Sequence, residues 1–487
     1  MRILSIIMIC VLLTGIIACS SPDDKPTADN TAVTTAAETA VTEEMDLFEI
    51  RSLISDDLPN EDFGGAQFLV LARDRQDFVD DIGTELEESG DIFLDSIYAR
   101  NSAVEERFNV EIVGVFDSNP IPKMRSAVLS GDSAYDIISG HVIEMGSSAL
   151  EGHYLDWYED LPYVNLDKPW YIGNAKDALS INNHAYIMAG EFNLSILRFT
   201  YCMYFNKELA EDFNTGDLYS VVNDGTWTID RLASIVKDVH EDINGDNVMD
   251  NTDLWGFTTD YYSAAVTYQY AFDHPVMKTG ADGIPEINAN TPKMISIIEK
   301  VYDFFYNNPG SLAENWGISG PIWNDGRALF LNGLFRDSGS YRDLDFDFGV
   351  IPYPKWDEAQ SDYYTMADGA HDVMAVPVTV SDVNKTSMII EALNAESYKQ
   401  VIPVYYEIAL KVKYARDDES VAVLDTILDG RYFDFGYIYD GWQGVAFLIQ
   451  DCTSGKTADY SSKYAAKENS AIKRYGEVID SLLSLDE

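Results

Sequence analysis

The alternation of strand-like and helix-like stretches between residues 66 and 139 constrains the fold of this chain more than any other feature. Short β-rich runs are separated by segments whose apolar residues recur at helical spacing, as at Ile92, Ile97 and Val104. We predict strands at 66–72, 110–115 and 135–139, and helices at 92–108 and 122–129. This order requires right-handed crossovers and a parallel sheet. The sequence therefore predicts an α/β fold.

The remainder of the folded part is long enough for a second lobe. We predict strands at 185–189, 200–205, 347–352 and 372–377, and helices at 232–239, 292–307, 325–332, 385–399, 404–411, 419–428 and 463–483. The strands at 185–189 and 200–205 carry the chain across to the second lobe. We expect the first lobe at roughly 64–190 with returning segments near 345–400, and the second at roughly 200–340 with the C-terminal helices.

The first 19 residues have the layout of a secretory signal. Arg2 supplies a positive charge, residues 3–13 are apolar except for Ser5, and Ile16-Ile17-Ala18-Cys19 resembles a bacterial lipobox. The apolar run is shorter than the roughly 20 residues that span a bilayer. We expect cleavage before Cys19 and palmitate-type acylation of its thiol, which anchors the chain firmly. An ordinary secreted protein cut near Ala18 and a buried apolar strand are the alternatives.

Residues 20–63 predict a disordered tether. They are acidic, low in complexity and rich in Thr and Ala, with the run TADNTAVTTAAETAVTEE. Such a segment cannot bury enough apolar surface to offset the entropy of ordering it. We therefore expect the folded body to occupy residues 64–487, held away from the membrane by this tether.

The charge excludes two classes of partner. The chain carries 82 acidic and 33 basic side chains, a net charge of −49. Nucleic acid and anionic bilayers both require a basic face, so we expect neither, and we expect membrane contact through the lipid alone. Cys202 and Cys452 stay in the mature chain, either free or as one disulfide, and no framework spacing supports their pairing.

Residues 242–253 have the spacing of a calcium-binding loop. Oxygen-bearing side chains stand at loop positions 1, 3, 5, 9 and 12, which are Asp242, Asn244, Asp246, Asp250 and Asp253, and the carbonyl of Val248 occupies position 7. Asn247 replaces the usual glycine at position 6, and Asp253 is shorter than the usual glutamate. We expect a structural calcium ion, and an acidic turn without metal is the alternative.

Motifs for metal-dependent proteolysis, serine-elbow hydrolysis, phosphate-loop and dinucleotide binding do not occur in the sequence. The six histidines include no closely spaced pair. Carboxylate pairs of glycosidases leave little trace in one sequence, so a surface glycan-acting hydrolase stays as an alternative. We expect a binding protein that is not an enzyme.

Several stretches in order resemble the extracellular solute-binding lipoproteins of ABC importers, especially their large sugar-binding group. The stretches are GDIFLDSIYARNSAVEERFNVEI (90–112), YDIIS (135–139), GTWTIDRLASIVKDV (225–239), WNDGRALFLNG (323–333) and MAVPVTVSD (374–382). In that family the fourth stretch forms a short helix near the ligand. YARDDES and FDFGYIY are similar to acidic members of Gram-positive bacteria.

This resemblance implies a periplasmic-binding-protein-like fold, with a ligand cleft between two lobes that are joined by hinge strands. It also implies a monomer on the outer face of the membrane that delivers a sugar or oligosaccharide to permease subunits. A carbohydrate-binding lipoprotein without transport is a further alternative.

Ligands of parallel sheets sit beyond the carboxyl ends of strands. This rule and the resemblance nominate polar and aromatic side chains in loops and at helix starts, for each of which core packing or a solvated turn is the alternative. The candidates are Arg73, Asp74, Ser139, His141, Trp255, Tyr261, Trp323, Asn324, Asp325, Asp368, Tyr437 and Trp442. We expect Trp323 and Trp442 to be the stacking platforms.

Overall fold

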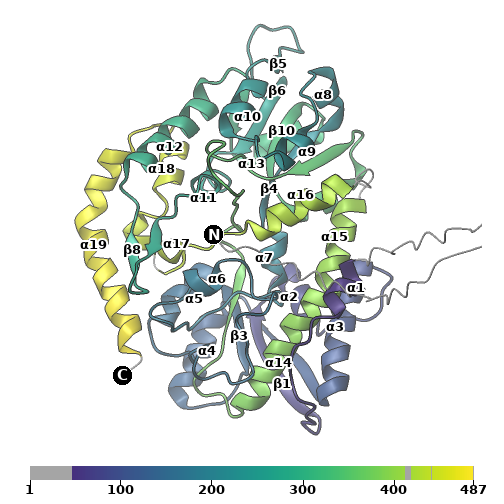
Figure 1. Cartoon of the computed structure of the whole chain (residues 1–487), viewed down its shortest axis with the longest axis vertical. Helices are drawn as coiled ribbons and strands as arrows, with labels where there is room; N and C mark the ends of the chain where they lie inside the picture. Colours follow the sequence, from purple (N-terminus) through teal and green to yellow (C-terminus); the bar gives the residue numbers. More distant parts are fainter. Residues whose placement is uncertain (1–46, 412–417, 440, 486–487) are drawn as a thin grey trace, which may run out of the picture. The chain divides into compact units, whose positions relative to one another are not determined.

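A four-stranded sheet forms the core of the first lobe in the computed structural model, which describes residues 47–411, 418–439 and 441–485 (Figure 1). Its strand order is β12-β3-β1-β2. The strands are β1 (Ala66–Arg73), β2 (Val110–Asp117), β3 (Ile137–His141) and β12 (Asp372–Ala375). The first three are parallel, and β12 runs antiparallel to β3. This confirms the three strands predicted between residues 66 and 139.

The crossover helices of this lobe are also confirmed. α3 (Ile92–Phe108) begins at Asp91, whose side chain accepts hydrogen bonds from two backbone N–H groups of the first turn, and α4 (Pro120–Ser130) ends at Gly131. Further helices of the first lobe are α2 (Gln76–Ile82), α5 (Val142–Ala149), α6 (Ala175–Ala178), α7 (Leu194–Arg198) and α14 (Val383–Glu396). Because helices cover both faces of the sheet, strand β1 has a continuous apolar run rather than a strict alternation.

A six-stranded sheet forms the core of the second lobe. Its main path is β11-β4-β10-β6-β5, with β9 paired to β6. The strands are β4 (Tyr201–Asn206), β5 (His240–Glu241), β6 (Leu254–Asp260), β9 (Ser311–Glu314), β10 (Ala328–Leu334) and β11 (Phe348–Ile351). β10 is parallel to β6 and antiparallel to β4. Strand β11 was expected in the first lobe, but it pairs with β4 and belongs to this sheet.

The predicted helix at 325–332 is wrong. Gly326 has a left-handed backbone with φ 71°, which ends α13 (Trp316–Asn324), and residues 328–334 then form β10. The side chains from Ala328 to Leu331 are all fully buried, so a central strand buries them on both faces. Burial in the sheet therefore overrides the local preference for helix.

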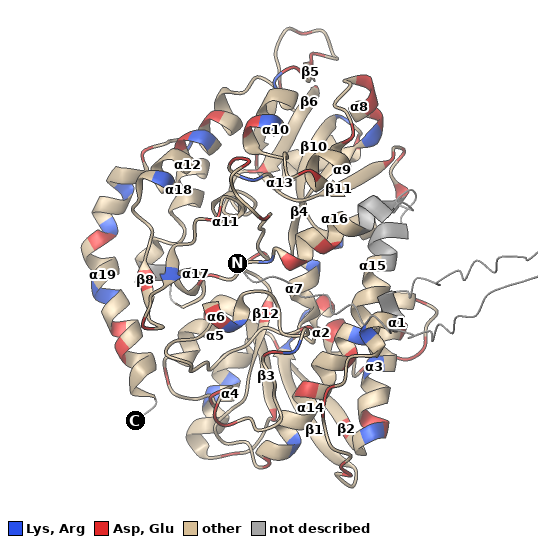
Figure 2. Cartoon of the chain, viewed as in Figure 1, with Lys and Arg blue, Asp and Glu red and all other residues tan. Residues whose placement is uncertain are grey.

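The remaining helices lie in the second lobe and the C-terminal part, except that η3 (Ser397–Val401) packs against α3 and α14 of the first lobe. They are α8 (Lys207–Asp212), α9 (Leu218–Asn223), α10 (Ile229–Val236), α11 (Thr267–Ala271), α12 (Pro292–Tyr302), η1 (Asp303–Asn307), η2 (Phe335–Asp343), η3, α15 (Ile402–Lys411), α16 (Asp418–Asp429), α17 (Phe435–Ile438), η4 (Gly441–Gly444), α18 (Leu448–Ser454) and α19 (Tyr460–Ser484). A hairpin of β7 (Met277–Thr279) and β8 (Pro285–Ile287) lies among them. Figure 2 shows acidic and basic residues interspersed along α12 and α19.

Three extended segments lie side by side where the chain passes between the sheets. The backbone N–H of Tyr201 donates to Met366 (2.9 Å), and that of Asp368 donates to Phe199 (2.8 Å). On the other side of the same segment, Thr365 donates to Gly430 (2.9 Å) and accepts from Tyr432 (2.7 Å). Residues 199–201, 364–368 and 430–432 thus form the connection, which leads into β4 and β12. We call them the crossing segments.

These connections confirm an α/β fold with two lobes. The expected strand at 185–189 does not form a ladder, since Met188 makes only an isolated bridge to Met374. The crossing into the second lobe instead begins near Phe199.

The ordered body begins before residue 64. Helix α1 (Leu47–Ser52) brings the Arg51 guanidinium to 4.2 Å from the Tyr398 ring centroid, and Arg107 pairs with Asp56 at 2.5 Å. The last residues of the expected tether are therefore packed on the first lobe, where the charged side chains of Arg51 and Asp56 are buried. The signal, Cys19 and the tether up to residue 46 lie outside the described residues.

Two further features concern the described residues. No helix among them has the length and apolar character needed to cross a bilayer. Cys202 and Cys452 are both free and buried, in β4 and α18.

Candidate functional site

A cavity of about 290 Å³, here called cavity A, lies at the carboxyl edge of the second-lobe sheet. It is lined by Tyr201, Asp260, Ser263, Ala264, Trp316, Asn332, Gly333, Leu334, Arg336, Asp337 and Asp368. These residues come from the ends of the parallel strands β6 and β10, the start of α13 and the crossing segments. That is the edge where ligands of open parallel sheets bind.

Asp260 organises the rim of cavity A. One carboxylate oxygen accepts backbone N–H groups of Tyr262 (2.9 Å) and Ser263 (2.6 Å), and the other accepts that of Trp316 (3.1 Å). The last bond places a negative charge on the first turn of α13, where the helix dipole favours it. Tyr262 and Trp316 are exposed by 44% and 43%, so Asp260 holds two accessible aromatic residues at the rim.

Asp368 joins the crossing segments to the cavity. Its carboxylate accepts from the Tyr201 hydroxyl (2.7 Å) and from the backbone N–H of Ala370 (3.0 Å). Burial, and then the Asp368 charge, raise the pKa of Tyr201 well above its usual value, so this hydroxyl keeps its proton and donates. Deeper in the cavity, the amide of Asn332 donates to Thr259 and to the Tyr268 hydroxyl, each at 3.1 Å.

Arg336 is the cation that lines cavity A. Its guanidinium lies 4.6 Å from the Phe199 ring centroid, and its distances to Asp337 (3.7 Å) and Asp77 (3.9 Å) exceed hydrogen-bond lengths. The Arg336 side chain is 46% exposed, so its donors face solvent. Asp337 accepts the backbone N–H of Leu334 (2.8 Å), and burial raises the pKa of its carboxyl group.

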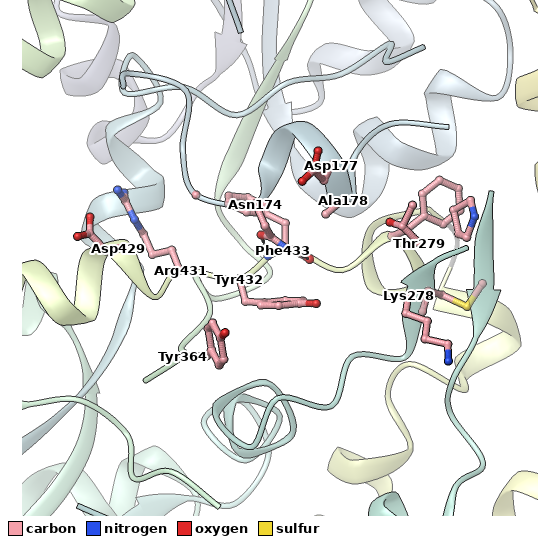
Figure 3. A pocket seen from close by; sticks show the side chains of 14 residues that line it. Asn174, Asp177, Ala178, Lys278, Thr279, Tyr364, Asp429, Arg431, Tyr432 and Phe433 are labelled. Carbon is pink, nitrogen blue, oxygen red and sulfur yellow. Dashed lines mark hydrogen bonds between the residues drawn. The ribbon is translucent and has the colours of Figure 1, made fainter. Parts of the chain in front are cut away.

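A second cavity of about 330 Å³, here called cavity B, lies between α6, the β7–β8 hairpin and residues 429–435 (Figure 3). Its labelled residues are Asn174, Asp177, Ala178, Lys278, Thr279, Tyr364, Asp429, Arg431, Tyr432 and Phe433. Figure 3 shows the Tyr432 ring across the middle, with Asp429 and Arg431 toward one end and Lys278 and Thr279 toward the other. Asn174 forms two hydrogen bonds with the backbone of Phe433, at 2.7 and 2.9 Å, which fix this wall.

Polar residues predicted at the first-lobe strand ends lie near the crossing segments, but they bond mainly to protein. Arg73 pairs with Asp372 at 2.5 Å, donates to the carbonyl of Ala370 and lies over the Phe78 ring at 3.6 Å. Ser139 is 2% exposed and accepts a hydrogen bond from Asn193 at 3.0 Å. Asp74 is exposed.

His141 is the last residue of β3 and is half-buried. Burial, and then the charge of Arg73, lower the pKa of His141, while burial lowers that of His371 to about 4. Both imidazoles are therefore neutral at neutral pH. Of the nominated residues whose side chains the structure describes, Asp368 is the one that lines cavity A.

The expectation for Trp323 is corrected. Its ring is fully buried, with centroids of Tyr204, Tyr341 and Phe346 within 6.0 Å, so neither face is left for a solute. It packs in the second-lobe core because the C-terminal half of α13 lies against the sheet.

Four other nominated residues also lie away from cavity A. Trp255 is 6% exposed and donates to the carbonyl of Asp250 (2.8 Å), so it anchors the 242–253 loop. Asn324 and Asp325 lie at the end of α13, where Asp325 pairs with Arg327 at 2.9 Å. Tyr261 donates its backbone N–H to Glu314 (3.2 Å) and packs on the core.

The two nominated residues near the C-terminus have different outcomes. Tyr437 is 7% exposed and packs against Tyr270 and Phe447, which makes it a wall residue rather than a ligand contact. The side chain of Trp442 lies outside the described residues, so its predicted role stays a prediction.

Sequence reasoning missed Trp316 and Arg336. Trp316 follows strand β9, and Arg336 follows β10, so the strand-end rule would have nominated both. Neither strand was predicted, because β9 has only four residues and β10 was taken for a helix.

The 242–253 loop has local features of a cation-binding turn. Asp242 accepts the backbone N–H groups of Gly245 and Asn247, each at 2.7 Å, and Asn247 has φ 64°, the left-handed conformation that position 6 needs. Asp253 is fully buried and accepts from Ile243 (3.1 Å) and Asp250 (2.8 Å). The donor set therefore fits a hard cation such as calcium in type.

A metal site also requires that the ligand atoms lie close to one another, and the turn pattern alone does not establish this. Among the described residues, one group of three brings its carboxylate or imidazole atoms within 4.8 Å of one another, and it consists of Asp156, Glu159 and His184. Asp156 there also accepts the backbone N–H groups of Tyr158 (2.9 Å) and Ala185 (3.2 Å), as part of a folded turn.

No protein-family model matches the sequence, and no curated protein matches it. Among solved structures, the chain is similar to a solute-binding protein of an ABC transporter from Agrobacterium radiobacter K84, crystallised in complex with ribitol. The identity is 11% and the TM-score 0.49, over 85% of this chain and 99% of that chain.

Proposed function

We propose that this chain is an extracellular solute-binding protein that captures a small polar solute in cavity A for an ABC importer. The observation that carries the proposal is the position of cavity A, at the carboxyl edge of one sheet and beside the segments that connect the two lobes. A solute that contacts both a lobe and its connection favours one relative arrangement of the lobes. Binding is thereby converted into a change of shape that membrane subunits can recognise.

The lining of cavity A suits a sugar or a polyol. Arg336 supplies donors, Asp368 supplies an acceptor, and the exposed Trp316 ring supplies a flat apolar surface. Hydroxyl groups both donate and accept, and the faces of sugar rings are apolar, so each of these groups has a partner on such a solute. The carboxylate of Asp260 is occupied by three backbone N–H groups, which favours a positioning role over proton transfer.

A thermal-shift and calorimetric screen of monosaccharides, oligosaccharides and polyols, with peptides as controls, tests the proposal. We expect saturable binding of at least one sugar or polyol, and compaction in solution scattering when it binds. Turnover of a glycan by the purified protein would instead support the hydrolase alternative. Binding without compaction would favour a carbohydrate-binding lipoprotein that has no transport role.

We also propose that Cys19 carries the lipid anchor on the outer face of the membrane. The signal-like start and the acidic segment up to residue 46 support this. Cys19→Ser should release a folded, ligand-competent protein that no longer supports uptake at low solute concentration. Retention of the Cys19→Ser protein in the membrane fraction would contradict the anchor.

We also propose one structural calcium ion in the 242–253 loop, supported by the type and the spacing of its oxygen donors. The chain would hold it with Asp242, Asn244, Asp246, Asp250, Asp253 and the carbonyl of Val248. Trp255 donates to the carbonyl of Asp250, so an ordered loop would also support the start of β6.

A further inference from the structure

We infer that cavity B binds a second unit of the same solute, so that the ligand is an oligosaccharide of at least two units. This inference rests on the proposed function, because it takes cavity A as the site of the first unit. It assigns a role to a cavity that lies outside the carboxyl edge of either sheet.

The two cavities share one wall element. The central crossing segment contributes Tyr364 to cavity B and Asp368 to cavity A. Hydrogen bonds to both neighbouring segments hold it extended between these two residues. Side chains four positions apart on an extended segment point to the same face, and their Cα atoms are roughly 13 Å apart. Both cavities therefore meet the same face of one rigid segment, at a separation that a short oligomer can span.

A row of tyrosine rings, Tyr432, Tyr270 and Tyr437, lies beside this segment and is here called the aromatic seam. The ring of Tyr432 in cavity B stacks on Tyr270, with centroids 5.8 Å apart and an interplanar angle of 22°, and Tyr270 meets Tyr437 edge-on at 6.4 Å. Tyr437 lies against Gly369, the neighbour of Asp368, so closely that a Cβ at Gly369 would be 2.5 Å from the Tyr437 hydroxyl. The seam thus runs from cavity B to the residue next to cavity A. Since Tyr270 and Tyr437 are 2% and 7% exposed, it is a rigid wall.

The open surface of cavity B suits a sugar ring. Tyr432 is half-buried, with Tyr270 stacked on one face and the Tyr364 ring at 5.8 Å and 82°. Figure 3 shows Asp177 and Ala178 of α6 across the cavity from the Tyr432 ring. The exposed side chains Asp177, Lys278, Thr279 and Asp429 supply donors and acceptors around an aromatic floor. This is the chemistry already assigned to cavity A, in a space of similar volume, about 330 against 290 Å³.

The test compares chain lengths of gluco-oligosaccharides, from one to four units in α-1,4 and in β-1,4 linkage, by titration calorimetry. For at least one linkage we expect the affinity to rise at least tenfold from one unit to two. Lys278→Ala and Tyr364→Ala should remove most of that gain while they leave the affinity for a single unit unchanged. Lys278 is exposed on the hairpin, so its variant keeps the fold, and melting temperatures check both proteins.

A matched variant in cavity A separates this inference from the proposed function. Trp316→Ala should weaken binding at every chain length, because cavity A holds the first unit in each complex. Equal affinity for one unit and for longer chains would overturn the inference and leave the proposed function standing. The same holds if Tyr364→Ala and Lys278→Ala weaken one-unit and two-unit ligands alike. Absence of binding of every sugar and polyol tested would refute the proposed function itself.

Discussion

Removal of the Asp260 carboxylate should loosen the rim of cavity A and destabilise the second lobe. The carboxylate accepts three backbone N–H groups, from two loop residues and from the first residue of α13. Hydrogen bonds to a charged acceptor contribute about 1.5–3 kcal/mol each when buried, but these three are near the surface, so about 1 kcal/mol each is the better estimate. Loss of the charge at the helix start removes about 0.5 kcal/mol more. We expect Asp260→Ala to lower the free energy of unfolding by about 3.5 kcal/mol.

Asp260→Asn tests the same reasoning at smaller amplitude, since the amide keeps one acceptor oxygen and loses the charge. Asp325→Ala is the control, because Asp325 lies at the other end of α13 in an exposed ion pair with Arg327, and such pairs contribute less than about 1 kcal/mol.

Urea unfolding gives the stabilities, and calorimetry with the best ligand from the screen gives the affinities. Asp260→Ala should weaken binding about tenfold, since it frees Tyr262 and Trp316. If Asp260→Ala matched Asp325→Ala in both measurements, the rim would not depend on this carboxylate.

Three other perturbations have defined outcomes. Burial raises the pKa of Glu391 to about 7, so its proton is held more tightly in the folded than in the unfolded state, and stability falls as pH rises from about 4.5 to 7. We expect the free energy of unfolding of Glu391→Gln, measured in urea at pH 4.5 and at pH 7, to fall by up to about 3 kcal/mol less over this range than that of the wild type. Identical pH profiles of the two proteins would contradict the burial argument. Trp316→Ala should weaken sugar binding about tenfold with the melting temperature unchanged within a few degrees, and an unchanged affinity would remove Trp316 from the site. EDTA should lower the melting temperature of the wild type but not of Asp246→Ala; equal responses would show that the 242–253 loop is not the metal site.

Local sequence predicted secondary structure correctly where an element packs on its immediate neighbours in the chain. The strands and helices between residues 66 and 139 form as predicted, because each βαβ unit buries its own apolar face. The segment 328–334 forms a strand, although its local sequence predicts a helix. Its partners β4 and β6 begin more than 70 residues away in the chain, and only their pairing makes a strand the favourable state.

The candidate site also contains both residues that the local sequence identifies and residues that it does not. Asp368 was found because polar residues beside a strand end at the sheet edge are visible in the sequence. Trp316 and Trp323 lie two turns apart on one helix, and helical periodicity alone treats them alike. The sheet covers the C-terminal end of α13 and leaves its first turn at the cavity, so Trp323 is fully buried and Trp316 is 43% exposed.

The sequence by itself determined the α/β class, the acidic surface and the positions of the longer helices, since these follow from local periodicity and composition. Tertiary structure alone decided which strands share a sheet, which aromatic rings stay accessible and that Tyr364 and Asp368, on one segment, line two different cavities. These features depend on contacts between residues far apart in the chain, for which a single sequence carries no spacing signal. Burial against those distant partners is the physical term that selects among the local alternatives.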